Sequence, residues 1–244
     1  MAKLQDEDFE KVTAAFIALH GLTVVRGPFK GMRYVNDPSI NVLTTKLLGI
    51  YECELYHTIE EQLIPERYGR IINVGCGDGY YAVGLALRMK RARVIAYDIK
   101  AAARRRCKQM AVLNGTIGRL TLESFCDTAA LQEKVRRSNE RKTLLFCDAE
   151  GYELKLLDPE LVPSLRYCDM LVELHDFINN AIKPTILARF EKTHSATIIK
   201  STCRERNPDD YPELQSLSEQ DRPLCVSERR PAGMEWVVLK SNHR

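Results

Sequence analysis

Acidic and imidazole side chains stand at the ends of several apolar, strand-like runs in this sequence. Asp98 and Asp148 each close such a run, and Glu173, His175 and Asp176 lie within or directly after a third one. Carboxylates and imidazoles can accept a proton or hold a metal ion. Because ligands of an open α/β sheet bind at the carboxyl ends of its strands, we expect these side chains to form one site.

A glycine-rich turn, Gly75-Cys76-Gly77-Asp78-Gly79, follows the apolar run 71–74 and leads into a helical pattern that opens with Tyr80. This is the pattern of a nucleotide-binding crossover, in which an acid after the second strand, here Asp98, binds the ribose hydroxyls. A dinucleotide site needs a further glycine, whereas bulky Tyr80 leaves little room for a pyrophosphate at the helix N-terminus. We therefore expect a ligand with an adenosine and an amino-acid end, S-adenosylmethionine (SAM).

The residues expected to face this cofactor come from the ends of the first four strands. Asp98 could instead cap the following helix, although ribose binding is the favoured interpretation. Asp78 is equally consistent with binding the amino-acid end and with capping its own helix. The full set is Asn73, Gly75, Cys76, Gly77, Asp78, Gly79, Tyr80, Asp98, Ile99, Cys126, Asp127 and Asp148.

His175 is the candidate catalytic base, because acids surround it at a strand end. Methyl transfer from a sulfonium is an in-line displacement that depends on alignment, and an alcohol acceptor must also lose its proton. Glu173 lies inside an apolar strand, where a carboxylate needs a partner. We expect His175 to be oriented by Asp176 or Glu173. The expected catalytic set is His175, Asp148, Glu173 and Asp176.

A divalent ion that lowers the pKa of the acceptor hydroxyl is the alternative mechanism. Its ligands would be Asp148, Glu150, His175 and Asp176. No tight D-x-D or D-D-N cluster occurs, so the sequence favours catalysis without a metal. Glu153 is expected to be structural, since acids suit the start of a helix.

Alternating strand and helix patterns must position these residues. An amphipathic helix over 6–20, a hairpin over 22–35 and a long helical region over 43–64 come first. Seven strands follow, near 70–75, 93–98, 119–125, 143–148, 169–175, 195–201 and 234–240. This order predicts an α/β fold with a mostly parallel, doubly wound, Rossmann-like sheet. We expect an N-terminal extension over 1–64 packed on one domain over 65–244, with 204–231 as a long exposed connection or a lid.

The composition is that of a globular protein, with 244 residues, 45% hydrophobic and 28% charged. A net charge of +3 gives no reason to expect a nucleic-acid partner. The basic stretches 88–93 and 100–108 are interpreted as solvated helix surfaces. Eight single cysteines and no apolar spanning run predict a reducing, cytoplasmic location away from the membrane.

Two blocks resemble known methyltransferase motifs. The block 73–81 resembles the first motif of class I SAM-dependent methyltransferases. The block Asp148-Ala149-Glu150-Gly151-Tyr152-Glu153, followed by Leu171-Val172-Glu173-Leu174-His175, is similar to the FkbM-type methyltransferases. This resemblance spans about 43–200 and implies O-methylation of hydroxyls on sugars or secondary metabolites. It further implies that Tyr51 and Glu52 approach the cofactor or substrate. The segment 204–231 has no counterpart in it.

The sequence favours O-methylation of a small-molecule or glycan hydroxyl over three other functions. N-methylation of nucleic-acid bases would call for an Asn/Asp-Pro-Pro-aromatic signature after the fourth strand, which is absent. A non-catalytic SAM-binding protein would not need the acids beyond Asp98. A nicotinamide-dependent oxidoreductase is disfavoured by Tyr80. The expected partner is therefore a small molecule or a glycan.

Overall fold

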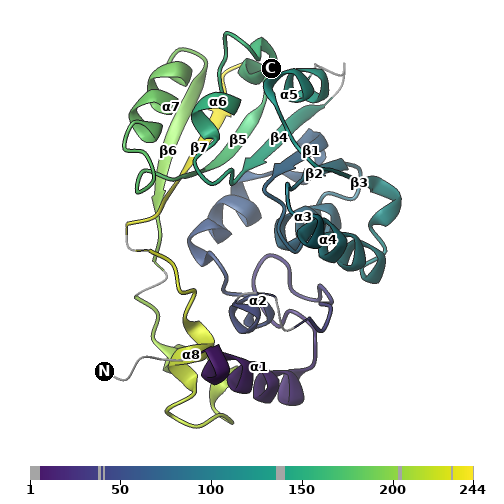
Figure 1. Cartoon of the computed structure of the whole chain (residues 1–244), viewed down its shortest axis with the longest axis vertical. Coiled ribbons are helices and arrows are strands. Elements are labelled where there is room, and N and C mark those ends of the chain that lie inside the picture. Colours follow the sequence, from purple (N-terminus) through teal and green to yellow (C-terminus); the bar gives the residue numbers. More distant parts are fainter. Residues whose placement is uncertain are drawn as a thin grey trace. The chain divides into compact units, whose positions relative to one another are not determined.

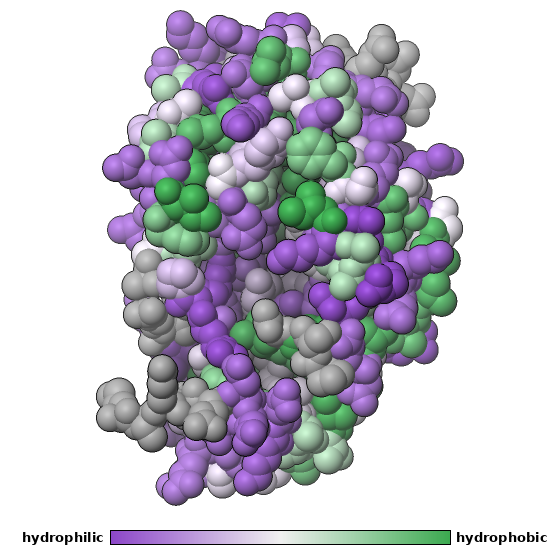
Figure 2. Space-filling view, in the orientation of Figure 1, coloured by the Kyte–Doolittle hydropathy of each residue, from purple (hydrophilic) through white to green (hydrophobic). Residues whose placement is uncertain are grey.

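The structure, a computed structural model, describes residues 6–37, 40, 42–135, 141–202, 205–231 and 233–243. It divides into two units, which we describe separately: a sheet unit of Leu63–Lys200 with Gly233–Arg244, and an N-terminal unit of Met1–Gln62 with Ser201–Ala232. Among the described helices none has the length and apolar character needed to cross a bilayer. On the face seen in Figure 2, hydrophilic side chains predominate and hydrophobic ones form separate patches.

Seven strands form one sheet in the order β3-β2-β1-β4-β5-β7-β6, which confirms the predicted fold class. β7 runs antiparallel to its two neighbours, whereas β1 to β5 are parallel (Figure 1). The strands are β1 Tyr68–Val74, β2 Arg93–Tyr97, β3 Leu120–Glu123, β4 Lys142–Cys147, β5 Asp169–Leu174, β6 His194–Lys200 and β7 Glu235–Ser241. The carboxyl ends of β1 to β5 consequently meet at one edge.

The register aligns the ends of the central strands. Val74 of β1 lies beside Tyr97 of β2 and beside Cys147 of β4. Asp98 and Asp148, which follow β2 and β4, therefore leave the sheet at the same edge, on either side of the glycine turn that follows β1. A shift of a single residue would turn each strand's side chains to the other face and away from their packing partners.

Helices cover the sheet because its central strands β1, β4 and β5 are largely buried on both faces. They are α3 Tyr80–Arg88, α4 Ala101–Leu113, α5 Thr128–Val135, α6 Glu153–Leu156 and α7 Ile182–Phe190 (Figure 1). Alternate strand residues such as Ile72 and Val172 pack with Leu156 and Ile186 of α6 and α7 in one core. On the opposite face Phe146 stacks on a tyrosine of α3, with ring centroids 4.0 Å apart.

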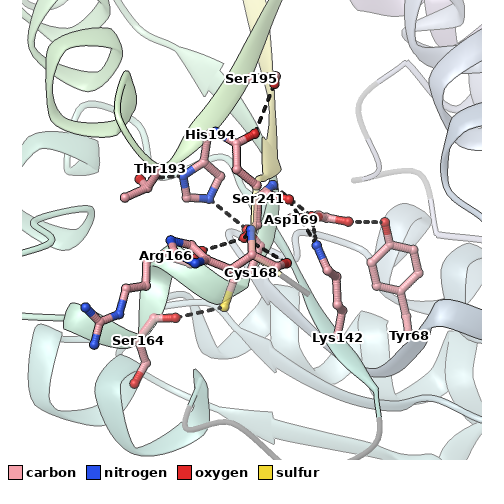
Figure 3. Close-up of polar contacts among 12 residues, drawn as sticks. Tyr68, Lys142, Ser164, Arg166, Cys168, Asp169, Thr193, His194, Ser195 and Ser241 are labelled. Carbon is pink, nitrogen blue, oxygen red and sulfur yellow. Dashed lines mark hydrogen bonds and ion pairs between the residues drawn. The ribbon is translucent and has the colours of Figure 1, made fainter.

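The amino ends of β1, β4 and β5 meet at the edge opposite to Asp98 and Asp148, around the buried carboxylate of Asp169 (Figure 3). Tyr68 donates to its Oδ2 at 2.8 Å, while Lys142 Nζ lies 3.1 Å from its Oδ1. Ser241 N, at the end of antiparallel β7, donates to the same Oδ1 at 3.0 Å. Both oxygens of Asp169 are thus satisfied, and its charge is paired.

His194, at the start of β6, joins this edge to β5. Its Nε2 donates to the carbonyl of Cys168 at 2.9 Å, and its Nδ1 lies 2.9 Å from the hydroxyl of Thr193 (Figure 3). Burial lowers the pKa of His194 despite the hydrogen bond to Cys168. The imidazole therefore remains neutral at neutral pH, with Nδ1 accepting from Thr193.

The N-terminal unit contains α1 Asp6–His20, α2 Leu43–Leu48 and α8 Arg222–Val226. The prediction of one long helical region over 43–64 is wrong, since α2 ends at Gly49, with φ of 79°, and Glu52 also has a left-handed φ of 51°. A short 3₁₀ turn, Cys53–Leu55, and a π turn, Thr58–Gln62, follow. The expected hairpin over 22–35 is present in short form, with one antiparallel bridge, Thr23 with Arg33, and backbone hydrogen bonds from Val24 N to Met32 O and from Tyr34 N to Leu22 O.

Residues 205–231 carry two 3₁₀ turns, Pro208–Asp210 and Pro212–Leu214, before α8. They group with the N-terminal residues through buried ion pairs. Arg230 lies 2.8 Å from a carboxylate oxygen of Glu52, and Arg206 lies 2.5 Å from one of Glu228. Burial and the nearby carboxylates of Glu52 and Glu54 outweigh Arg206 and raise the pKa of Glu228 to about 7. Glu52, which the family resemblance places near the ligand, is buried in this ion network.

Lys142→Met should destabilise the protein by about 3 kcal/mol, because it leaves the buried charge of Asp169 without its cation. Urea denaturation measures this change. Lys134→Met is the matched control: within the part of the chain that the structure describes, Lys134 pairs with the partly exposed Glu123 and the exposed Glu133, so we expect little change. Equal midpoints for the two variants would show that the ion pair with Asp169 does not stabilise the sheet.

Candidate functional site

The glycine turn is bound to the end of β2 by backbone hydrogen bonds. Gly75 N and Cys76 N both donate to the carbonyl of Tyr97 at 2.9 Å. Gly77 N donates to Asp98 Oδ2, also at 2.9 Å. The turn and the acid after β2 therefore form a single rigid structure, as the crossover pattern predicts.

Gly75 brings this turn against the end of β4. Its φ is 76°, and a Cβ at this position would lie 1.8 Å from the carbonyl oxygen of Asp148. Asp148 N in turn donates to Val74 O at 3.0 Å. Only glycine allows so close an approach, so the turn and the acid after β4 hold each other in place.

A cavity of about 410 Å³ opens at the carboxyl ends of β1 to β4. Its walls combine apolar and aromatic side chains with a few polar groups, the usual character of a small-molecule site. The lining residues are Val74, Gly75, Gly77, Tyr97, Asp98, Ile99, Lys100, Ala103, Arg106, Ser124, Phe125, Cys126, Asp148, Ala149, Glu150 and Tyr152. Exposed Ile99 and Phe125 are available to flank a flat ring.

Asp98 lies at the start of α4 and also at the cavity, so the structure is compatible with both roles considered from the sequence. Its Oδ1 accepts from Lys100 N at 2.8 Å, at the start of α4, and its Oδ2 accepts from Gly77 N. It also lines the cavity. Each carboxylate oxygen can accept more than one hydrogen bond, so these contacts still allow a bond to a ligand.

Several predicted cofactor residues do not line the cavity. Asp78 Oδ1 accepts from Tyr80 N at 3.2 Å, and Asp127 Oδ1 accepts from Ala130 N at 2.7 Å, so both acids cap helices. Asn73 is buried within the sheet. Those that do line it are Gly75, Gly77, Asp98, Ile99, Cys126 and Asp148, whereas Asn73, Cys76, Asp78, Gly79, Tyr80 and Asp127 do not.

Beside this cavity four carboxylates surround one imidazole, and we name Asp148, Glu150, Glu153, Glu173 and His175 the carboxylate–imidazole group. His175 is 2% exposed, and its Nδ1 donates to Glu153 Oε1 at 2.8 Å. Its Nε2 lies 3.5 Å from Asp148, 3.7 Å from Glu150 and 3.8 Å from Glu173. Because Asp148 also lines the cavity, the group adjoins a bound ligand.

Glu153 orients the imidazole, a role that the sequence interpretation assigned to Asp176 or Glu173. Glu153 has no exposed surface, and its Oε1 also accepts from Ala149 N at 3.1 Å and Gly151 N at 3.3 Å. Asp176 instead accepts from Lys183 N at 2.9 Å, near the start of α7. The position of Glu153 shortly after Asp148 in the sequence was the signal that could have placed it in the site. However, an acid at the start of a helix is usually explained by the helix dipole, so the sequence offered no reason to prefer a role at His175.

The protonation of His175 reflects two opposing effects. Burial lowers its pKa, but the hydrogen bond and charge of Glu153, with the charges of Asp148 and Glu150, outweigh burial and raise it above its usual value. The carboxylates thus create a negative potential at Nε2. Such a potential favours any cation there, whether a proton or a metal ion.

No protein-family model matches this chain, and no curated protein matches it in sequence. Among solved structures it is similar in fold to the O-methyltransferase TomG of Streptomyces achromogenes in complex with SAM. The two are 12% identical, with 98% of this chain and 100% of that chain covered and a TM-score of 0.52. It is also similar to an O-methyltransferase of Bacillus cereus in complex with SAH, which is 14% identical, with 98% of this chain and 94% of that chain covered and a TM-score of 0.46. An rRNA methylase of Streptococcus thermophilus is likewise 14% identical, with 72% of this chain and 87% of that chain covered and a TM-score of 0.46. The likeness to TomG shows the Rossmann-like fold.

The contact between Gly75 and Asp148 yields a paired test. Gly77→Ala meets no atom within 4 Å and should cost only the left-handed conformation, about 1–2 kcal/mol. Gly75→Ala adds a clash with the backbone and should cost about 1–3 kcal/mol more. Urea denaturation of both variants measures the difference, and equal losses would show that the turn can move away from β4 freely.

Proposed function

We propose that this chain is a SAM-dependent methyltransferase, related to the FkbM type, that methylates a hydroxyl oxygen of a small molecule or glycan. One observation carries the proposal. Asp148 lines the cavity at the ends of β1 to β4 and also lies 3.5 Å from His175 in the carboxylate–imidazole group. A nucleoside site and a proton-accepting group therefore share one residue.

The cavity suits SAM in three respects. Ile99 and Phe125 offer apolar surface for the adenine, and Asp98 offers carboxylate oxygens to the ribose hydroxyls. Asp148 places a negative side chain in the same cavity, which attracts the positive sulfonium. The buried ring of Tyr80 at the start of α3 stands where a dinucleotide site would have a glycine.

The proposed reaction transfers one methyl group. A bond forms between the acceptor oxygen and the methyl carbon, the carbon–sulfur bond breaks, and sulfur keeps its electron pair to give S-adenosylhomocysteine (SAH). The acceptor's proton leaves as its oxygen attacks. Two arrangements of the carboxylate–imidazole group achieve this: His175 as a free base, or His175 as a ligand of an ion that acidifies the hydroxyl.

An oxygen acceptor is favoured because the group supplies what an alcohol needs. A hydroxyl is a weak nucleophile until its proton is removed, and carboxylates and imidazole perform that step. We also propose a reducing compartment, the cytoplasm, as the site of action. Seven cysteines lie in the described residues, and all seven are free thiols, as is usual there.

Calorimetry with SAH tests the cofactor. The wild-type chain should bind SAH and should not bind NAD, since Tyr80 replaces the glycine that a pyrophosphate requires. Asp98→Ala should weaken SAH binding by about 1–3 kcal/mol, the loss of a buried hydrogen-bond partner. Asp127→Ala is the control, because Asp127 caps α5 outside the cavity. Binding of NAD in preference to SAH would refute the proposed function.

Transfer of labelled methyl from SAM to a panel of hydroxylated small molecules and glycans tests the reaction. His175→Ala should reduce turnover by about 10²- to 10⁴-fold while SAH affinity stays constant, since His175 does not line the cavity. Glu153→Gln, which retains an acceptor for Nδ1 but removes the charge, should have a smaller effect. Unchanged turnover in His175→Ala would exclude the carboxylate–imidazole group from the reaction.

A further inference from the structure

We infer that the carboxylate–imidazole group holds a divalent metal ion, with Asp148, Glu173 and His175 as its protein ligands. One carboxylate oxygen from each acid and one ring nitrogen lie within 4.8 Å of one another. This set differs from the one expected from the sequence, because Glu173 replaces Glu150 and Asp176. The role of the ion, although not its binding, rests on the proposed methyl transfer.

The spacing of the donor atoms is that of metal ligands. His175 Nε2 lies 3.5 Å from Asp148 Oδ1 and 3.8 Å from Glu173 Oε2, beyond the usual length of a hydrogen bond. Two atoms that each bind one ion at about 2.1 Å are separated by about 3–4 Å. An ion bound to Nε2 can therefore also reach each of these two carboxylate oxygens.

The hydrogen bond from Nδ1 to Glu153 orients the buried imidazole of His175 in the way that is common for metal-binding histidines. Its Nδ1 donates to Glu153, its one hydrogen bond to the described residues, and this leaves Nε2 directed at Asp148 and Glu173. Metal-binding histidines commonly donate their other ring nitrogen to a carboxylate in this way. Glu153 is fully buried and accepts two backbone N–H groups besides, so the orientation of the ring is fixed before an ion arrives.

The local charge favours a cation. Asp148, Glu150 and Glu173 each place a carboxylate oxygen 3.5–3.8 Å from Nε2, so this position attracts positive charge. A divalent ion there would offset the negative charge of Asp148 and Glu173.

The donor set indicates the class of ion. Two carboxylate oxygens suit Mg²⁺ and Mn²⁺, whereas an imidazole nitrogen suits transition metals. Mn²⁺ accepts both kinds of donor and is the probe of choice. In the reaction, the acceptor's hydroxyl oxygen would bind the ion and become more acidic. Its proton would pass to the exposed carboxylate of Glu150, 3.7 Å from Nε2, as the oxygen attacks the methyl carbon and the C–S bond breaks.

The test is a titration of the full chain with Mn²⁺, with and without SAH. The EPR signal of the free aqueous ion measures how much Mn²⁺ remains unbound. We expect one ion per chain in the wild type. Glu173→Gln should lose affinity for Mn²⁺ by more than the about 10- to 100-fold typical of an outer-shell partner, and Glu153→Gln should lose about that much. Asp176→Asn is the matched control, since it changes the residue next to His175 outside the ligand set, and its affinity should equal that of the wild type.

SAH binding separates this inference from the proposed function. Glu173 does not line the cavity, so Glu173→Gln should bind SAH as the wild type does, which also shows that the variant is folded. A wild type that binds SAH but no Mn²⁺ overturns the metal site and leaves the methyltransferase intact. Methyl transfer that persists after chelation overturns the role of the ion in the reaction and leaves His175 as the free base. Equal Mn²⁺ affinities in Glu173→Gln and the wild type overturn the ligand set.

Discussion

The contact of Gly75 with the carbonyl of Asp148 is the constraint on which the site depends. A Cβ at Gly75 would lie 1.8 Å from that oxygen, so the glycine turn and the end of β4 can meet only because the side chain is missing. The turn is bound to Tyr97 and Asp98 on its other side. The carboxyl ends of β1, β2 and β4 are therefore held together. This contact sets the distance between the cavity and the carboxylate–imidazole group, because Asp148 belongs to both.

The two ends of the sheet differ in how the charges of their acids are balanced. At the amino ends, Asp169 is neutralised by Lys142 and receives hydrogen bonds from Tyr68 and Ser241, a closed arrangement with nothing left to bind. At the carboxyl ends, His175 lies among four acids. The first edge stabilises the fold, whereas the second keeps a negative potential that a cationic ligand can satisfy. This division is the usual one between structural and functional ends of a parallel sheet.

Local patterns predicted the strands and the glycine turn well, because apolar runs such as 71–74 are read from neighbouring residues. The same patterns failed where a partner is distant in sequence. Glu153 resembles any acid at a helix start, and only the fold brings its carboxylate to His175. The prediction of one helical region over 43–64 was wrong for a related reason, since the contact that ends α2 is made with a residue distant in sequence. Backbone packing at Gly49, where a Cβ would lie 2.1 Å from the carbonyl of Arg26, ends the helix.

Asp127 and Asp176 show that an acid after a strand cannot be assigned to a binding site from its position in the sequence alone. Both follow strands of the parallel sheet, yet their carboxylates accept backbone N–H groups near the start of the next helix. A short acid in this position can either cap a helix or face a ligand, and the sequence is the same in both cases. Asp98 combines the two positions, because its two oxygens accept hydrogen bonds from Gly77 and Lys100 while the residue also lines the cavity.

Under the proposed function, the charge of the site changes during the reaction. SAM brings a positive sulfonium next to Asp148, and transfer of the methyl group converts it into the neutral thioether of SAH. The attraction between the sulfur and the carboxylates therefore weakens once the bond to the acceptor has formed. A divalent ion held by Asp148, Glu173 and His175 would offset part of this attraction. The carboxylates beside the cavity favour the charged cofactor over its product to the extent that no ion compensates them.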